Sequence, residues 1–211
     1  MKNWRIWLFL VSIVIVGPVA YFSSAPLKSA ESYEGTRLSG IAPDFRLTDQ
    51  YGELVSLSDF GGRIVALTFM DSQCKDVCPL TAAQLLQAYK QLDQREIYQV
   101  VFMAVNVNIQ ANTDADAMLA TQNWHLDELP SWHFLTGSAE ELASIWKAYG
   151  VSAISQESND VIHTPGVFLI DQARQKRWYI STPYSAGGNV ELALPLSELL
   201  VRYVREILGD K

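Results

Sequence analysis

Residues 64–92 read IVALTFMDSQCKDVCPLTAAQLLQAYKQL and hold both cysteines of the 211-residue chain, Cys74 and Cys78. The apolar run 64–69 predicts a buried strand, and the stretch 80–92, rich in Ala, Leu and Gln, predicts a helix. A loop therefore carries the chain from the strand to the helix. If both cysteines open that helix, their spacing of four residues places them on one face with Cα atoms roughly 6 Å apart.

Two thiols at this spacing can form a disulfide or bind one metal ion together. A helix N-terminus lowers the pKa of a cysteine and so favours the thiolate that either role needs. An inert structural disulfide is the alternative, but closing so short a loop removes little entropy from the unfolded chain. A closed zinc site normally needs four Cys or His ligands. The pair Cys74 and Cys78 therefore predicts redox or metal chemistry, and the spacing leaves both open.

Residues 1–22 predict a membrane anchor. The segment 6–22 is almost entirely apolar and follows Lys2 and Arg5, so its N-terminus is expected in the cytoplasm with the remaining chain exported. A cleaved signal peptide is the alternative. The best small-residue cleavage site, at 23–25, is followed by Pro26, which makes cleavage less attractive. Either route delivers the two cysteines to an oxidising compartment, where a thiol pair forms a disulfide unless something keeps it reduced.

The composition indicates one globular domain behind this segment. The chain is 49% hydrophobic, which suffices for a single packed core. Its 16 Lys and Arg against 23 Asp and Glu give a net charge of -7, which argues against nucleic acid as a partner. Residues 23–40 carry Ser, Pro, Lys and Glu without an apolar period and predict a flexible linker, with the domain at 41–211.

Strand-like and helix-like segments alternate along this domain. Strands are expected at 45–47, 54–57, 64–69, 98–107, 132–135, 167–170 and 177–181, and helices at 80–93, 115–124, 138–149 and 197–208. The first two strands and the last two are expected to form hairpins. Ser138, with Glu141 three residues later, and Ser197 are expected to cap the last two helices. This order predicts an α/β domain with a mixed sheet flanked by helices.

Three motifs point to a known family. They are Ala42-Pro43-Asp44-Phe45, Cys74-x-x-x-Cys78-Pro79 and Trp132-His133-Phe134-Leu135-Thr136-Gly137. With them, residues 41–208 resemble the Sco/SenC family, membrane-anchored thioredoxin-fold proteins that deliver copper to the CuA centre of cytochrome c oxidase. His163 stands eight residues before Asp171, which is the spacing of the family's third copper ligand.

The resemblance implies a thioredoxin-like mixed sheet preceded by one N-terminal transmembrane helix. It implies copper as the bound metal, with Cys74, Cys78 and His163 as its ligands, and this set of two thiolates and one imidazole suits Cu(I). The implied partner is the CuA subunit of the oxidase or another copper or thiol protein. The implied location of the domain is the exported, periplasmic or equivalent, side of the membrane.

Departures from the family pattern support an alternative, a membrane-anchored thiol-disulfide oxidoreductase that reduces cysteines of a partner protein. Lys75 replaces the proline that usually follows the first cysteine, and residues 108–112 read NIQAN where the family carries Asp-Pro-x-x-Asp. Pro165 is placed like the cis-proline of thioredoxin-like reductases, so a cis Thr164–Pro165 bond is expected if the chain is a reductase. In that reading Cys74 attacks the substrate disulfide and Cys78 resolves the intermediate.

Overall fold

The structure, a computed structural model, describes residues 33–156, 161–182 and 194–209. The membrane anchor predicted at 1–22 lies outside these residues. Across the three described ranges, no helix combines the length and the apolar character that crossing a membrane requires.

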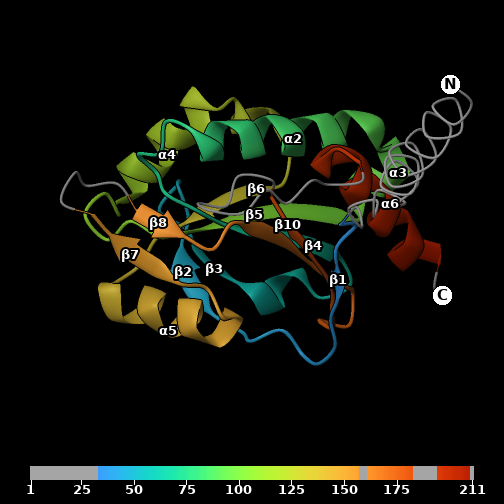
Figure 1. The fold of residues 1–211 in the computed structure, drawn as a ribbon, viewed down its shortest axis with the longest axis horizontal. Coiled ribbons are helices and arrows are strands. Elements are labelled where there is room, and N and C mark those ends of the chain that lie inside the picture. Colours follow the sequence, from blue (N-terminus) through green and yellow to red (C-terminus); the bar gives the residue numbers. More distant parts are fainter. Residues whose placement is uncertain (1–32, 157–160, 183–193, 210–211) are drawn as a thin grey trace, which may run out of the picture. The chain divides into compact units, whose positions relative to one another are not determined.

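A six-stranded mixed sheet runs through the middle of the domain (Figure 1). Its strands, in spatial order, are β1 (Thr36–Arg37), β10 (Lys176–Ser181), β9 (Gly166–Ile170), β4 (Ile64–Met70), β5 (Val100–Asn106) and β6 (Trp132–Leu135). The three strands β4, β5 and β6 are parallel, whereas β9 is antiparallel to both β4 and β10. The predicted mixed sheet flanked by helices is therefore confirmed.

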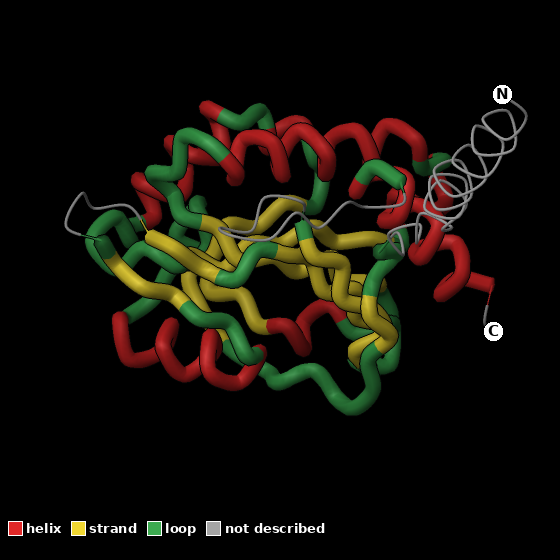
Figure 2. The backbone as a smooth tube through the Cα atoms, in the orientation of Figure 1, coloured by secondary structure: helices red, strands yellow, loops and turns green. Residues whose placement is uncertain are grey.

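Both faces of the sheet are covered, which explains the continuous apolar run of β4. Ile64, Ala66 and Met70 pack into the core on one face, and the alternate residues Val65, Leu67 and Phe69 pack into the core on the other. The first face is covered by α2 (Val77–Gln91), α4 (Asp114–Asn123), η2 (Leu126–Glu128) and α6 (Leu196–Gly209). The second is covered by β2 (Arg46–Thr48), β3 (Leu54–Ser56), η1 (Leu57–Phe60) and α5 (Ala139–Tyr149), as Figure 2 shows.

Several local predictions are confirmed. The strands β2 and β3 form the first hairpin, and β9 and β10 form the last one. Ser138 caps α5 by accepting a hydrogen bond from the backbone N–H of Glu141, and the Glu141 carboxylate accepts one from the Ser138 N–H in return.

Other local predictions differ from the structure. The strand expected from residue 98 begins at Val100, because α3 (Gln94–Tyr98) precedes it and is capped by the Asp93 side chain. Ser197 lies inside α6, which begins at Leu196, so Ser197 does not cap that helix. A short hairpin of β7 (Ala153–Ser155) and β8 (Val161–His163) was not expected.

The sheet also includes residues from the segment expected to be a linker. Thr36 and Arg37 of β1 pair with Tyr179 and Trp178 of β10, so the described part of the domain starts before Ile41.

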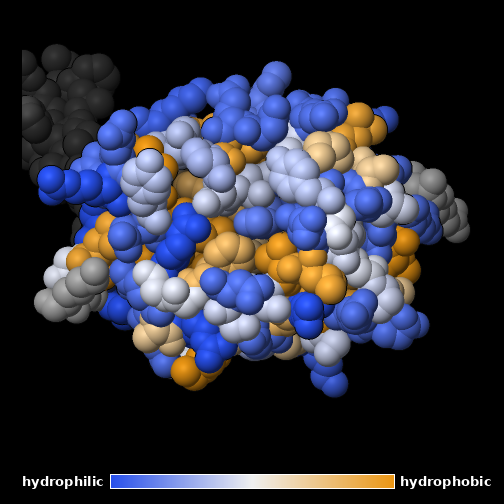
Figure 3. Space-filling model, turned by 180° about the vertical axis from the view of Figure 1, so that it is seen from behind, coloured by the Kyte–Doolittle hydropathy of each residue, from blue (hydrophilic) through white to orange (hydrophobic). Residues whose placement is uncertain are grey.

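The surface on the side opposite to the view of Figure 1 carries its hydrophobic groups in separate patches among hydrophilic side chains (Figure 3). The buried apolar side chains form two cores, one on each face of the sheet.

Candidate metal centre

The two cysteines lie on either side of the start of α2. Cys78 is the second residue of the helix and is 2% exposed, whereas Cys74 lies in the preceding loop and is half-buried. Only Cys78 is therefore on the helix, contrary to the simple picture in which both cysteines open it. Both are free cysteines. The loop instead folds Cys74 back over the first turn of α2.

The sulfur of Cys74 serves as the N-terminal cap of α2. It accepts a hydrogen bond of 3.3 Å from the backbone N–H of Cys78, while the side chain of the cap residue Asp76 makes no such bond. The pKa of Cys74 falls to about 6, because the Cys78 thiol donates a hydrogen bond to it and backbone N–H groups of residues 76–78 add to this effect against the opposing burial. Cys74 is therefore a thiolate at neutral pH.

Cys78 behaves in the opposite way. Its pKa lies well above its ordinary value, because its thiol hydrogen bonds to Cys74, because it is buried, and because the charges of Cys74 and Asp71 disfavour a second anion. The pair therefore holds one thiolate and one thiol at neutral pH. A soft cation that neutralises charge at this position can displace the remaining proton.

A buried carboxylate lies next to the cysteine loop. Asp71, directly after β4, is 3% exposed, and its side chain accepts hydrogen bonds of 2.9 Å from the Gln73 backbone N–H and 2.9 Å from the Asn108 side-chain amide. Its backbone carbonyl accepts a bond of 3.1 Å from the N–H of Cys74. These contacts set the path of the chain from the central strand to Cys74.

The loop after β5 is fixed to the cysteine loop by asparagines. The side-chain amide of Asn106, which is fully buried, donates to the carbonyl of Ala111 at 2.8 Å and to the Asn112 side chain at 3.2 Å. The Ser72 hydroxyl donates to the same Ala111 carbonyl at 2.6 Å. In the sequence, residues 108–112 stand out only as a departure from a family pattern, and their contacts with the cysteine loop were not predicted. The available signal was that Asp71 and Asn106 follow or end adjacent parallel strands, whose carboxyl ends share one edge of the sheet.

His163 is at the same edge of the sheet. Thr68 of β4 pairs with Val167 of β9, so the residues just before β9 lie beside the end of β4 from which the cysteine loop departs. The His163 Nδ1 is 3.2 Å from the carbonyl oxygen of Thr164, an arrangement in which Nδ1 carries the hydrogen and Nε2 keeps its lone pair. Burial lowers the pKa of His163, which keeps the imidazole neutral at pH 7.

The three predicted ligands are not gathered into one cluster. Cys74 and Cys78 are in hydrogen-bond contact, and the charge of Asp71 acts on both Cys78 and His163. Yet within the described ranges no three side chains of His, Cys, Asp or Glu are grouped closely enough to hold a metal ion. The two cysteines are therefore in contact. The His163 imidazole lies at the same edge of the sheet but does not complete a three-ligand set with them.

The prediction of a cis-proline at residue 165 is wrong. All peptide bonds of the described residues are trans, including Thr164–Pro165. The carbonyl of Pro165 accepts a hydrogen bond of 2.7 Å from the Tyr179 hydroxyl, and β9 begins at the next residue. A Cβ at Gly166 would overlap the Tyr179 ring, so glycine is what fits at this first residue of β9, beside β10.

The fold and the paired cysteines define a class: α/β proteins with a central mixed sheet and a dithiol placed between the central strand and the following helix. A model of the SCO1/SenC family matches residues 34–190, and the chain belongs to this family. The mitochondrial SCO2 homolog of Bos taurus is 30% identical over 133 residues, which are 60% of this chain and 48% of that protein. The chain spans about half the length of the curated relatives it matches.

Solved structures agree with this fold. Apo Sco1 of Thermus thermophilus is 26% identical, with a TM-score of 0.63 over 84% of this chain and 98% of that one. ScoI of Arabidopsis thaliana, solved with copper bound, is 23% identical, with a TM-score of 0.63 over 81% of this chain and 99% of that one. The second likeness is one of fold alone.

Proposed function

We propose that this protein is a copper metallochaperone that assists assembly of the CuA site of cytochrome c oxidase. The observation that carries the proposal is the Cys74 thiolate at the start of α2, in hydrogen-bond contact with Cys78, in a member of the SCO1/SenC family. Copper is cargo in this proposal, taken up on Cys74, Cys78 and His163 and passed to the oxidase subunit or another copper protein.

The chemistry of these side chains suits Cu(I). Two thiolates and a neutral imidazole are soft or borderline ligands, which Cu(I) prefers over oxygen donors. The Cys74 thiolate meets the ion first, and the Cys78 thiol loses its proton as the second sulfur binds. His163 supplies Nε2 and has to approach the cysteines to complete the set. The choice of copper rests on this set of side chains and on the membership of the chain in the SCO1/SenC family.

The location follows from the N-terminal segment in this proposal. Residues 1–22 anchor the chain in a membrane, and the domain faces the periplasm or the equivalent exported compartment, as the positive flank at Lys2 and Arg5 predicts. A tether behind the anchor gives the domain reach toward a membrane-bound recipient.

Thiol-disulfide exchange remains the second candidate, because one observation favours it. A half-buried thiolate at Cys74 beside a buried thiol at Cys78 is the arrangement in which one sulfur attacks and the other resolves. The trans Thr164–Pro165 bond, however, removes the feature that distinguished a reductase most clearly from a carrier. Copper carriage is therefore the better single proposal.

A competition titration tests the proposal. The reduced full chain is titrated with Cu(I) in the presence of a chromophoric Cu(I) chelator, next to the Cys74→Ser and Cys78→Ser variants. One tightly bound copper per wild-type chain and the loss of tight binding in both variants are expected, because a hydroxyl is a poor Cu(I) ligand. Binding of equal strength and stoichiometry in either variant would exclude the corresponding sulfur from the site.

A further inference from the structure

A second concave site lies at the edge of the sheet opposite to the cysteines. It is a cavity of about 480 Å³ at the amino ends of the parallel strands, where Arg63 precedes β4, Val100 opens β5 and Ser131 precedes β6. The cysteine loop leaves the other end of the same strands. The copper chemistry proposed above uses none of the residues around this cavity.

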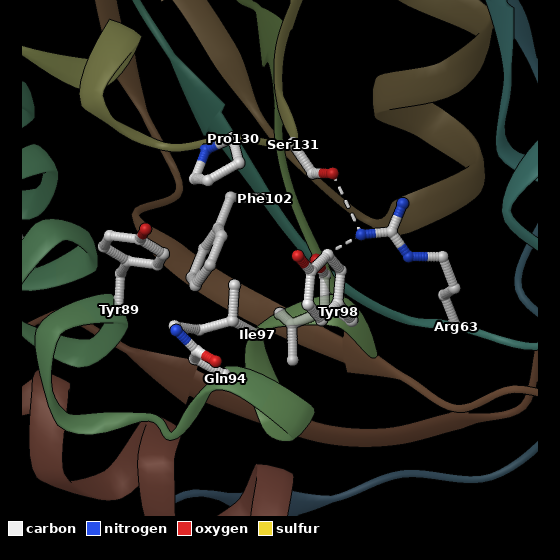
Figure 4. Close-up of a pocket in the computed structure, with 9 residues that line it drawn as sticks. Arg63, Tyr89, Gln94, Ile97, Tyr98, Phe102, Pro130 and Ser131 are labelled. Atoms are coloured by element: carbon white, nitrogen blue, oxygen red, sulfur yellow. Dashed lines mark hydrogen bonds between the residues drawn. The ribbon is translucent and has the colours of Figure 1, made fainter.

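One part of the cavity is aromatic and apolar. Figure 4 shows the rings of Tyr89, from α2, and Phe102, from β5, close together beneath Pro130, with Ile97 of α3 next to them. Phe102 is 5% exposed and belongs to the core, so its ring is held in place by packing. Flat rings and a proline at one wall are suited to contact with a planar, apolar group.

The other part carries a positive charge. Arg63 is half-buried, and its Nη2 donates hydrogen bonds of 2.8 Å to the carbonyl of Val100 and 2.9 Å to the Ser131 hydroxyl, both drawn in Figure 4. Its Nε is buried without a hydrogen-bond partner. Because the Ser131 oxygen accepts the bond from Arg63, the hydroxyl hydrogen of Ser131 remains to be donated to a further acceptor.

Among the described residues, the Arg63 charge has no counter-ion. The other half-buried arginines of the described ranges, Arg174 and Arg177, form ion pairs with Asp44 and Asp171. Arg63 has no such partner within those ranges, and none of the residues lining the cavity is acidic, although the chain has a net charge of -7. A half-buried guanidinium beside an open cavity is best compensated by an anion from outside the chain.

We propose that this cavity binds a small aromatic carboxylate. The ring packs against Phe102, Tyr89 and Pro130, and the carboxylate faces the Arg63 guanidinium and the Ser131 hydroxyl. The site is separate from the dithiol, and its occupation is independent of whether copper is carried.

The probe for a first test is 2-naphthoate, and the uncharged 2-naphthamide is its matched control. Both are titrated into the isotopically labelled full chain while backbone amide signals are followed by NMR. A ligand of this size binds with a Kd of about 1 mM or below on ordinary ligand efficiency. We expect saturable shifts centred on Val100 and Ser131, and at least about tenfold weaker binding of the amide, since a charge-assisted hydrogen bond is lost.

Variants of Arg63 and Ser131 test which side chains bind the carboxylate of the ligand. Arg63→Gln is expected to weaken naphthoate binding at least about tenfold, whereas Arg46→Gln, an exposed arginine on β2, leaves it unchanged. Ser131→Ala is expected to weaken binding without removing the guanidinium, and it carries the test if Arg63→Gln does not fold. The proposal is overturned by the absence of saturable shifts at 10-fold the expected Kd, by equal binding of the amide, or by shifts centred on Cys74.

Discussion

The side-chain amide of Asn108 donates a hydrogen bond of 2.9 Å to the carboxylate of Asp71, three residues before Cys74. Both residues are buried, with 1% and 3% of their surfaces exposed. The bond holds a carboxylate at the end of the central strand, where its charge acts on Cys78 and on His163. When the cysteine pair is oxidised or reduced, its charge therefore changes close to the fixed Asp71 carboxylate.

Asp71→Asn is expected to raise the reduction potential of the cysteine pair and to leave the Cu(I) affinity nearly unchanged. The reduced pair carries one negative charge and the disulfide carries none, so a fixed anion favours the disulfide. Binding of Cu(I) with release of the Cys78 proton leaves the net charge of the site as it was. For two unit charges at the separations usual within one site near a protein surface, we expect a rise on the order of tens of mV. Redox titration with a dithiol buffer and chelator competition measure the two quantities.

Asp76→Asn is the matched control for this charge change. Asp76 lies in the same loop, is exposed and caps nothing with its side chain, so water screens its carboxylate. Its removal should move the potential less than the removal of the Asp71 carboxylate does. An equal shift in the two variants, or a large loss of Cu(I) affinity in Asp71→Asn alone, would contradict the charge argument.

The reactivity of Cys74 should depend on pH with a midpoint near its pKa of about 6. The rate of alkylation by iodoacetamide is expected to rise through this midpoint and to level off above it, because the thiolate is the nucleophile. In Cys78→Ala the midpoint should move up toward the ordinary value of 9.0, because the hydrogen bond from the Cys78 thiol is the largest cause of the lowering. A midpoint that stays near 6 in this variant would assign the lowering to the helix terminus instead.

Stability should also rise with pH between about 7 and 8.5. In this interval the unfolded Cys74 thiol, with an ordinary pKa of 9.0, binds a proton that the folded thiolate does not. Because the unfolded state binds more protons, the free energy of unfolding increases with pH, and the contribution is lost as pH falls through about 6. Urea denaturation of the reduced protein measures the slope, which Cys74→Ser should remove. A slope that persists in this variant would point to another group.

Replacing His163 by Asn is expected to lower the Cu(I) affinity by at least about tenfold while leaving the fold intact, since even a supporting partner of a ligand contributes that much. His125→Asn serves as the control, because His125 is exposed and its φ of 57° is one that asparagine tolerates. Equal affinities of the wild type and the His163 variant in the chelator competition would reduce the proposed site to the two sulfurs.

Mild oxidation should join Cys74 and Cys78 in an intramolecular disulfide that does not bind copper. Their hydrogen-bond contact places the two sulfurs within reach of each other, and a disulfide sulfur has lost the charge that makes it a ligand. Mass spectrometry is expected to show the loss of two hydrogens from a monomer. A cysteine-linked dimer as the main product would mean that the two thiols separate in solution.

Much of the fold was predictable because it depends on patterns that a local window contains. The strands β4 and β9 are short continuous apolar runs, β10 alternates buried and half-buried residues, and α5 has a complete capping box. The α3 helix and β1 were not predicted. The first is only five residues long, so its capping box of Asp93 and Glu96 was the one signal available, and the second has two residues and depends on its pairing with β10.

The residues of the candidate site could be predicted from the sequence, but their arrangement in space was less predictable. The spacing of Cys74 and Cys78 identified the dithiol, but the hydrogen bond that makes the first sulfur a helix cap depends on the course of the loop between them. Asp71 was not expected because its partner, Asn108, is 37 positions away and reaches it only through the pairing of β4 with β5. Pro165 likewise makes a contact that a local window does not contain, since its carbonyl accepts a hydrogen bond from the Tyr179 hydroxyl.

The capping of α2 by a sulfur has a consequence for how the two states of the protein differ. A sulfur bound to copper or to a second sulfur carries less negative charge and is a weaker acceptor for the N–H of Cys78, so the cap on the first turn of α2 is expected to weaken when the site is filled or oxidised. The first turn of α2 is then expected to be ordered differently in the loaded and empty forms. Amide exchange rates at residues 77–80 should record that difference directly.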